Sequence, residues 1–197
     1  MKKLITFISL CLAMVMVLPL MSCTGGKSAK SDGKEAKVDD VSSHGPVCSA
    51  DEALKWAKGA GALVYENGEY TGAEAWNDFH TSVLREEPAS LLLATYMTSN
   101  DAEADHTPQL TFYYIVYNGE YFVVSERGSD EKTVRASEKY MHLLRLDDDY
   151  MSESVLNAIY MLVDNPTITW KQIMEGMLSS ASPDMVKHFW IYSEKKQ

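Results

Sequence analysis

Residues 109–127 read QLTFYYIVYNGEYFVVSER. Two runs that are rich in β-branched and aromatic residues flank the dipeptide Asn118-Gly119. A type I′ turn needs positive φ at both of its central residues, and Asn-Gly tolerates this well. The stretch therefore predicts a β-hairpin whose strands are Gln109–Tyr117 and Glu120–Arg127.

Further segments of the chain show the same residue types with a period of two. They predict strands at 90–98, 133–137, 140–146, 158–164 and 187–193. Residues 158–164 are compatible with either a strand or a helix, and the Asn165-Pro166 that follows them favours a strand. A second Asn-Gly pair, at 67–68, predicts another turn.

Three capping boxes mark the starts of helices. Each is a Ser or Thr followed three residues later by Glu or Gln, and they stand at Ser49–Glu52, Thr71–Glu74 and Thr169–Gln172. The first helix is expected to end near Lys58, and the second before Pro88. Apolar residues and one histidine share a face of the second helix, which predicts that this face is buried: Trp76, Phe79, His80, Val83 and Leu84.

The order of these elements indicates the fold class. Helices come first, a run of hairpin-linked strands follows, and a helix and one more strand end the chain. This order predicts an α+β fold, a mainly antiparallel sheet of about five to seven strands with two or three capped helices packed on it. We expect a helix lying across a long curved meander, as in cystatin-like folds.

The first 23 residues have the pattern of an export signal. Lys2 and Lys3 precede an uncharged apolar run, Leu4–Leu18, and Ser22 stands directly before Cys23. This arrangement resembles the lipobox of bacterial lipoproteins, in which the cysteine is acylated and becomes the new N-terminus. The resemblance implies a signal peptide at 1–22, a lipid on Cys23 and attachment to a membrane through that lipid. The alternative is an uncleaved spanning helix, which Pro19 disfavours.

The rest of the chain divides into a tether and one domain. Residues 23–47 are rich in Gly, Ser, Lys and Asp and contain no aromatic residue, which predicts a flexible tether. Residues 48–197 have the length of a single domain. Near the C-terminus, the segment from Thr167 to Ser180, with His188 and Tyr192, resembles the ends of uncharacterised exported proteins of gut-type bacteria. That resemblance implies a strand–helix–strand ending and no particular activity.

The charge of the chain limits its partners. The signal segment contains two of the 18 basic residues and none of the 28 acidic ones, so the mature chain has a net charge of −12. Residues 24–47 balance to zero, so the excess lies in the domain. An acidic domain repels nucleic acid and anionic lipid surfaces, and we expect neither as a partner.

Few residues stand out as candidates for chemistry. Cys48 is the one cysteine left after Cys11 is removed and Cys23 is acylated, so it is buried and inert, paired with another molecule or a functional thiol. His80 is a candidate acid–base group, although a partly buried, hydrogen-bonded histidine is the simpler interpretation. Tyr113 and Tyr114 are adjacent on a strand, so they point to opposite faces, and we expect one of them on a face away from the helices.

The sequence contains no catalytic motif, and we predict no catalytic residue, metal or cofactor. The expected function is that of a non-enzymatic module that binds a protein or peptide partner in the cell envelope. Two alternatives stay open, an envelope hydrolase and a module for a small solute or glycan. Thr24 follows the acylated cysteine where an inner-membrane retention signal would have Asp, which favours an outer membrane, facing the periplasm or the cell surface. The oligomeric state is left open.

Overall fold

The computed structural model describes residues 45–98, 107–147, 156–178 and 187–195, all within the compact unit 36–197. The predicted signal peptide, the lipid site Cys23 and the tether up to residue 44 lie outside the described residues. In the described part, no helix is long and apolar enough to cross a membrane.

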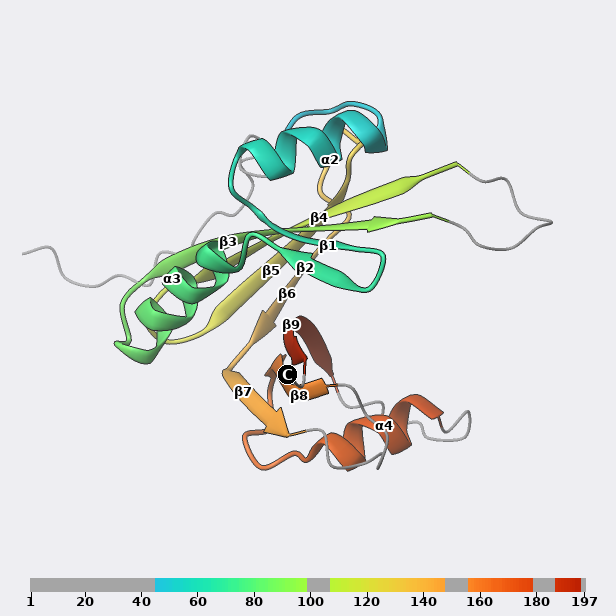
Figure 1. Cartoon of the computed structure of the whole chain (residues 1–197). Coiled ribbons are helices and arrows are strands. Elements are labelled where there is room, and N and C mark those ends of the chain that lie inside the picture. Colours follow the sequence, from blue (N-terminus) through green and yellow to red (C-terminus); the bar gives the residue numbers. More distant parts are fainter. Residues whose placement is uncertain (1–44, 99–106, 148–155, 179–186, 196–197) are drawn as a thin grey trace, which may run out of the picture. The chain divides into compact units, whose positions relative to one another are not determined.

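The described part contains nine strands and three helices (Figure 1). In chain order these are α2 (Ala50–Gly59), β1 (Leu63–Glu66), β2 (Glu69–Thr71), α3 (Ala73–Leu84), β3 (Ala89–Met97), β4 (Gln109–Tyr117), β5 (Phe122–Gly128), β6 (Ala136–Tyr140), β7 (His142–Asp147), β8 (Leu156–Val163), α4 (Trp170–Leu178) and β9 (His188–Lys195). The predicted α+β class is confirmed, with more strands than the five to seven expected.

The strands form two sheets. The larger sheet has the order β2-β1-β3-β4-β5-β6, and the smaller has the order β7-β8-β9. All pairs are antiparallel except β1 and β3, which run parallel with Leu63 opposite Leu93. The helix α3 lies between these two strands in the chain and supplies the crossover that a parallel pair requires. The expected meander is present as β3–β6, extended by the parallel β1.

The predicted hairpin forms, but its turn differs from the predicted type I′. Tyr117 pairs with Phe122, and the backbone N–H of Asn118 donates to the carbonyl of Tyr121. Gly119 has φ of 98°, whereas Asn118 has no positive φ. Instead the side-chain oxygen of Asn118 accepts the N–H groups of Glu120 and Tyr121, each at 2.9 Å. This side-chain capping replaces the turn that the dipeptide predicted.

The other Asn-Gly pair has the angles of a type I′ turn. Asn67 and Gly68 have φ of 52° and 80° and connect β1 to β2, whose end residues Glu66 and Glu69 are paired. Positive φ at both central residues matches the twist of the two strands. The turn predicted at 67–68 is therefore confirmed, and it belongs to a hairpin whose strands the sequence analysis did not identify.

Two of the three capping boxes form. The carboxylate of Glu52 accepts the N–H and the hydroxyl of Ser49, and Gln172 does the same for Thr169. The box at Thr71–Glu74 is wrong. Thr71 is the last residue of β2 and pairs with Val64, so α3 begins after Gly72, which has a left-handed φ of 78°.

Two further predictions need correction. The strand expected at 133–137 runs instead from Ala136 to Tyr140, because Tyr140 pairs with Phe122 and fixes the register. On α3, Trp76 and Phe79 are buried as expected, but Leu84 is 72% exposed because it lies in the last turn.

Each face of the larger sheet carries a different helix. Leu91 and Leu93 of β3 belong to the core that contains Trp76 and Phe79 of α3, together with residues of β8 and β9. Ala94 points to the other face and packs in the core formed under α2. A third core lies between the smaller sheet and α4. The structure therefore differs from the expected single helix across a meander, because a helix packs on each face of the larger sheet and another packs on the smaller sheet.

The folded part begins before Cys48. The guanidinium of Arg127, fully buried, donates from Nη2 to the carbonyl oxygens of Gly45 and Pro46 at 2.9 and 3.1 Å and from Nη1 to that of Glu131 at 2.6 Å. Its carbon also lies 5.4 Å from the centre of the Phe112 ring. Residues 45–47, assigned to the tether by their composition, are thus fixed to β5.

Candidate functional site

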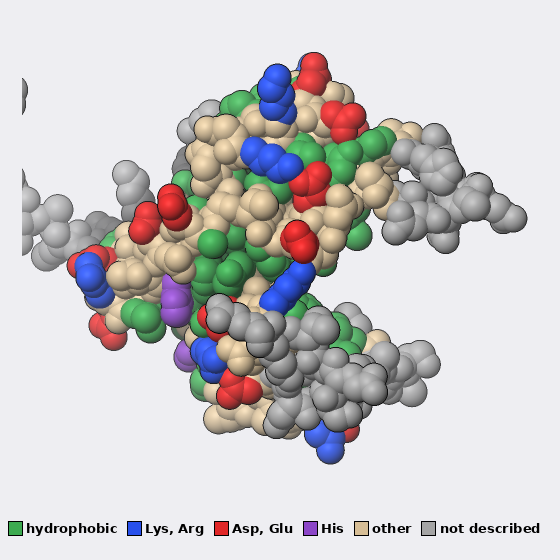
Figure 2. All heavy atoms as spheres, viewed as in Figure 1, with side chains coloured by type: hydrophobic (Ala, Val, Ile, Leu, Met, Phe, Trp, Pro, Cys, Tyr) green, Lys and Arg blue, Asp and Glu red, His purple; other side chains and the backbone are tan. Residues whose placement is uncertain are grey.

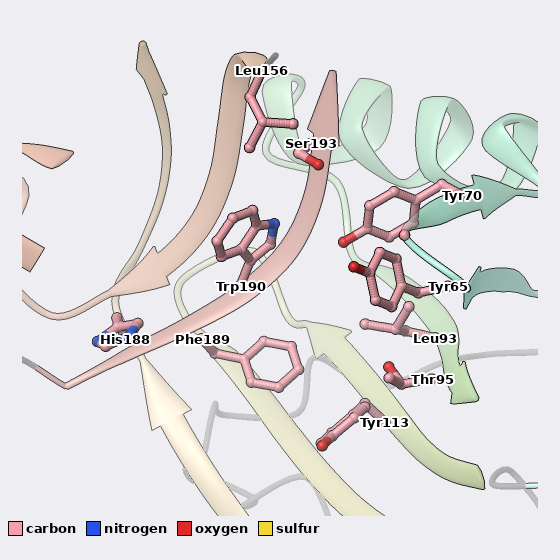
Figure 3. Close-up of a pocket in the computed structure, with 11 residues that line it drawn as sticks. Tyr65, Tyr70, Leu93, Thr95, Tyr113, Leu156, His188, Phe189, Trp190 and Ser193 are labelled. Carbon is pink, nitrogen blue, oxygen red and sulfur yellow. The ribbon is translucent and has the colours of Figure 1, made fainter. Parts of the chain in front are cut away.

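A pocket lined largely by aromatic residues lies between the larger sheet and β9 (Figure 3). Its volume is about 460 Å³, within the range of ligand-binding pockets. Figure 2 shows hydrophobic side chains that reach the surface in the hollow between the two sheets. The described residues that line the pocket are Tyr65, Gly68, Tyr70, Leu93, Thr95, Tyr113, Leu156, His188, Phe189, Trp190 and Ser193.

The two adjacent tyrosines of β4 point to opposite faces of the sheet, and Tyr113 is the one that lines the pocket. Tyr113 packs against the core that contains Ile115 and Tyr117, two and four residues further along the same face. Tyr114 lies on the opposite face, the face of the buried Phe112 and of α2. The opposite orientation of the two residues is confirmed. The expectation that one of them lies on a face without helices is wrong, because a helix packs on each face.

Five aromatic rings form the walls of the pocket. Tyr65 and Tyr70, on the β1–β2 hairpin, have ring centres 4.9 Å apart, and Tyr113 and Phe189 have ring centres 5.0 Å apart with the planes at 61°. The fifth ring is that of Trp190, which also packs edge-to-face on Trp170 of α4 at 5.6 Å. Such tilted pairs present both ring faces and ring edges to a ligand.

One polar group in this wall, the indole N–H of Trp190, makes no well-formed hydrogen bond. Its Nε1 is buried and has no hydrogen bond among the described residues. Burial raises the pKa of the nearby Tyr70 phenol, and the Trp190 side chain, close to a hydrogen bond with that phenol, lowers it to a smaller extent. Buried donors are almost always hydrogen-bonded, which makes this N–H, without a well-formed bond to Tyr70, a candidate donor to a ligand.

The polar groups of the pocket are hydroxyls, the indole of Trp190 and the imidazole of His188. Thr95, Ser193 and the three tyrosines supply the hydroxyls, and the described lining includes one histidine and no carboxylate, lysine or arginine. Burial raises the pKa of Tyr113, with the charge of Glu126 adding to the effect, so this phenol stays protonated at neutral pH. The lining therefore suits an uncharged, largely apolar ligand.

His80 lies outside this pocket, in the aromatic cluster under α3. Its ring stacks on Trp76 at 5.1 Å between centres and lies 5.2 Å from Tyr160. Burial lowers the pKa of His80, and the charge of Glu194 partly opposes that shift. The packing matches the interpretation of a partly buried histidine in the core.

The pKa of His80 predicts a pH dependence of stability. Because its pKa is lowered in the folded state, the unfolded state binds more protons, and stability decreases as the pH falls below the ordinary histidine value of about 6.5. We expect urea denaturation to show a larger loss between pH 7.5 and 5.5 for the wild-type chain than for His80→Gln. Equal losses would contradict this assignment.

The surroundings of Cys48 do not activate its thiol. It is half-buried and packs against the core under α2, on the face of the larger sheet opposite the pocket. Burial and the charge of Glu52 raise the pKa of the thiol, and nearby Arg127 lowers it to a smaller extent. A raised pKa favours the less reactive thiol form.

The structure does not bring the four candidate residues of the sequence together. Tyr113 lines the pocket, Tyr114 and Cys48 lie on the other face, and His80 lies under α3. Tyr65, Tyr70 and Trp190 line the pocket but were not predicted as site residues. The Asn-Gly turn at 67–68 was the available signal for the first two, since it implied flanking strands that carry both tyrosines.

Among the described residues, no three His, Cys, Asp or Glu side chains are placed to hold a metal ion. Comparisons of the chain with protein-family models, with curated proteins and with solved structures found no match.

Proposed function

We propose that this chain is an exported, lipid-anchored binding module without enzymatic activity. In this proposal, the aromatic pocket takes an apolar group of a protein or peptide partner in the cell envelope. The observation that carries the proposal is the lining of the pocket, five aromatic rings with neutral hydroxyls and an unpaired indole N–H.

The same lining favours an apolar group over the alternative ligands. A sugar ring exposes many hydroxyls, and specific recognition of them needs polar partners in fixed positions. The described lining offers mainly rotatable hydroxyls and no carboxylate or amide side chain. A hydrolase needs a nucleophile or base with an orienting partner, and the sequence contains no motif that would supply such a set.

The test is binding of N-acetyl-tryptophanamide, a neutral mimic of an aromatic side chain, to the full chain. We expect saturation-transfer NMR to detect binding, which Thr95→Trp weakens at least tenfold by filling the pocket and Tyr113→Ala weakens by removing a wall. Tyr114→Ala is the matched control, because it removes a neighbouring tyrosine of similar exposure from the other face of β4. Methyl glucoside should not bind. Binding of the glucoside alone, or loss of binding in the control, would contradict the proposal.

The anchor is tested at Cys23. Replacing it with Ala removes the thiol that would carry the lipid, so we expect Cys23→Ala to leave the membrane fraction and to lose labelling by palmitate. Cys48→Ala is the matched control and should behave as the wild-type chain. Membrane attachment and palmitate labelling that persist in Cys23→Ala would refute lipid anchoring.

A further inference from the structure

The pocket runs along the edge of β9. Phe189 is paired with Leu162 and belongs to the core between the sheets, whereas Trp190 is paired with Met161 and belongs to the core under α4. Neighbouring residues of a strand point to opposite faces. Because both of these residues line the pocket, the pocket borders the edge of the strand rather than one of its faces (Figure 3).

That edge is open in the described part of the chain. β9 pairs with β8 on one side, and no other described strand pairs with it. An open edge presents unpaired N–H and C=O groups that can pair with another chain. The irregularity between the partners Tyr160 and Met161 leaves Ile191 outside the register and separates two regularly paired segments of β9, His188–Trp190 and Tyr192–Glu194.

The other open edges carry short strands or charges that discourage pairing, whereas β9 has one irregularity, at Ile191, and no charged residue from Phe189 to Ser193. β2 has three residues, β6 has Glu138 and Lys139 in its middle, and β7 includes Arg145. Short edge strands and charges are common protections against edge pairing. In β9 the run Phe-Trp-Ile-Tyr-Ser, residues 189–193, contains no charge. Its charged residues stand at the C-terminal end.

We propose that the ligand is an extended polypeptide segment that adds to β9 as a fourth strand of the smaller sheet. This inference rests on the proposed function of the pocket. A large apolar side chain of the segment lies among Tyr65, Tyr113 and Phe189, and one of its backbone carbonyls accepts the indole N–H of Trp190.

The charge of the domain predicts what flanks that side chain. The mature chain has a net charge of −12, and Glu69, 75% exposed, lies on β2 next to the pocket residue Tyr70 and forms an ion pair with Lys195 of β9 at 3.3 Å. Glu126 on β5 acts electrostatically on Tyr113 and forms an ion pair with Arg135 at 3.4 Å. The net negative charge of the domain, rather than either of these paired carboxylates, attracts a segment with Lys or Arg on either side of the apolar residue and repels an acidic one.

The first experiment selects ligands from random nine-residue peptides displayed on phage. The full chain in detergent is the bait, and Thr95→Trp, with its pocket filled, is used for counter-selection. We expect the selected peptides to share one large apolar position with Lys or Arg nearby. Failure to select any peptide overturns this inference, while binding of N-acetyl-tryptophanamide would still support the proposed function.

The second experiment scans a selected synthetic peptide with N-methyl groups, one backbone nitrogen at a time. Successive N–H groups of a strand point to opposite sides, so pairing with β9 predicts a period of two. Methylation at alternate positions should weaken binding at least tenfold, and methylation between them should have little effect. Uniform insensitivity would overturn strand addition and leave the pocket as a side-chain site. A dimer in sedimentation equilibrium that the peptide does not dissociate would assign the edge to a second copy of this chain and overturn the inference.

Discussion

Replacing Gly72 with Ala should destabilise the fold more than the same change at any other glycine that the structure describes. Gly72 has φ of 78°, and a Cβ at this position would lie 2.1 Å from the carbonyl oxygen of Ala62. The left-handed conformation costs a non-glycine residue about 1–2 kcal/mol. The clash adds to this, because the contacting atom is backbone at the start of β1 and cannot move without disturbing the β1–β3 pairing. We expect Gly72→Ala to lower the free energy of unfolding by about 3 kcal/mol or more, which urea denaturation would measure.

Two other glycines separate the conformational cost of positive φ from the cost of the steric clash. Gly68 has φ of 80° but no atom within 4 Å of an added Cβ, so Gly68→Ala should show the conformational cost alone, about 1–2 kcal/mol. Gly59 is helical with open space around it, and Gly59→Ala should stabilise the chain by up to about 1 kcal/mol. If Gly72→Ala lowered the free energy of unfolding no more than Gly68→Ala does, the close contact between Gly72, at the start of α3, and Ala62, just before β1, would be contradicted.

Arg127→Met should lower the free energy of unfolding by about 3 kcal/mol or more, because four backbone carbonyls lose their donor and each unsatisfied buried acceptor costs about 1–3 kcal/mol. Methionine keeps much of the length and packing of the side chain, so the effect reports on the hydrogen bonds rather than on a cavity. We expect a loss at the low end of the summed cost for these carbonyls, because most of them are only partly buried. In addition, the variant no longer has to bury a guanidinium, which offsets part of the cost. Chemical denaturation of the full chain measures the effect.

A second measurement locates the change. Since Arg127 holds Gly45 and Pro46, protection of the amide of Cys48 from hydrogen exchange should decrease in Arg127→Met; that amide donates to the carbonyl of Ser129 at 2.9 Å. The exposed Arg85 supplies the matched control, and Arg85→Met should change stability by less than about 0.5 kcal/mol. Unchanged exchange at Cys48 would show that Arg127 does not fix this segment.

The sequence predicted elements well where local patterns and pairing agree. Gln109–Tyr117 was predicted with the bounds that the structure has, because a long run of β-branched and aromatic residues meets a hairpin signal. The Thr71–Glu74 box was a valid local pattern, yet the pairing of Thr71 with Val64 in β2 overrode it. β1 and β2, with four and three residues, are too short for a period of two to stand out.

The pocket depends on contacts between residues far apart in the sequence. Alternation along β4 separates Tyr113 from Tyr114 but does not tell which of them faces a ligand. That choice follows from the position of β9, where Phe189 packs on Tyr113 at 5.0 Å. The hairpin that carries Tyr65 and Tyr70 contributes another wall. No local pattern specifies such a meeting of three distant segments.

The indole N–H of Trp190 provides the most direct test of the pocket as the ligand site. In an ¹H–¹⁵N spectrum of the labelled full chain, we expect N-acetyl-tryptophanamide to shift this signal, together with the amides of Thr95, Tyr113 and Phe189. Signals from the opposite face, such as those of Ala53 and Phe112, should stay in place. An unmoved Trp190 indole signal, with the largest shifts on the α2 face or none at all, would contradict the account.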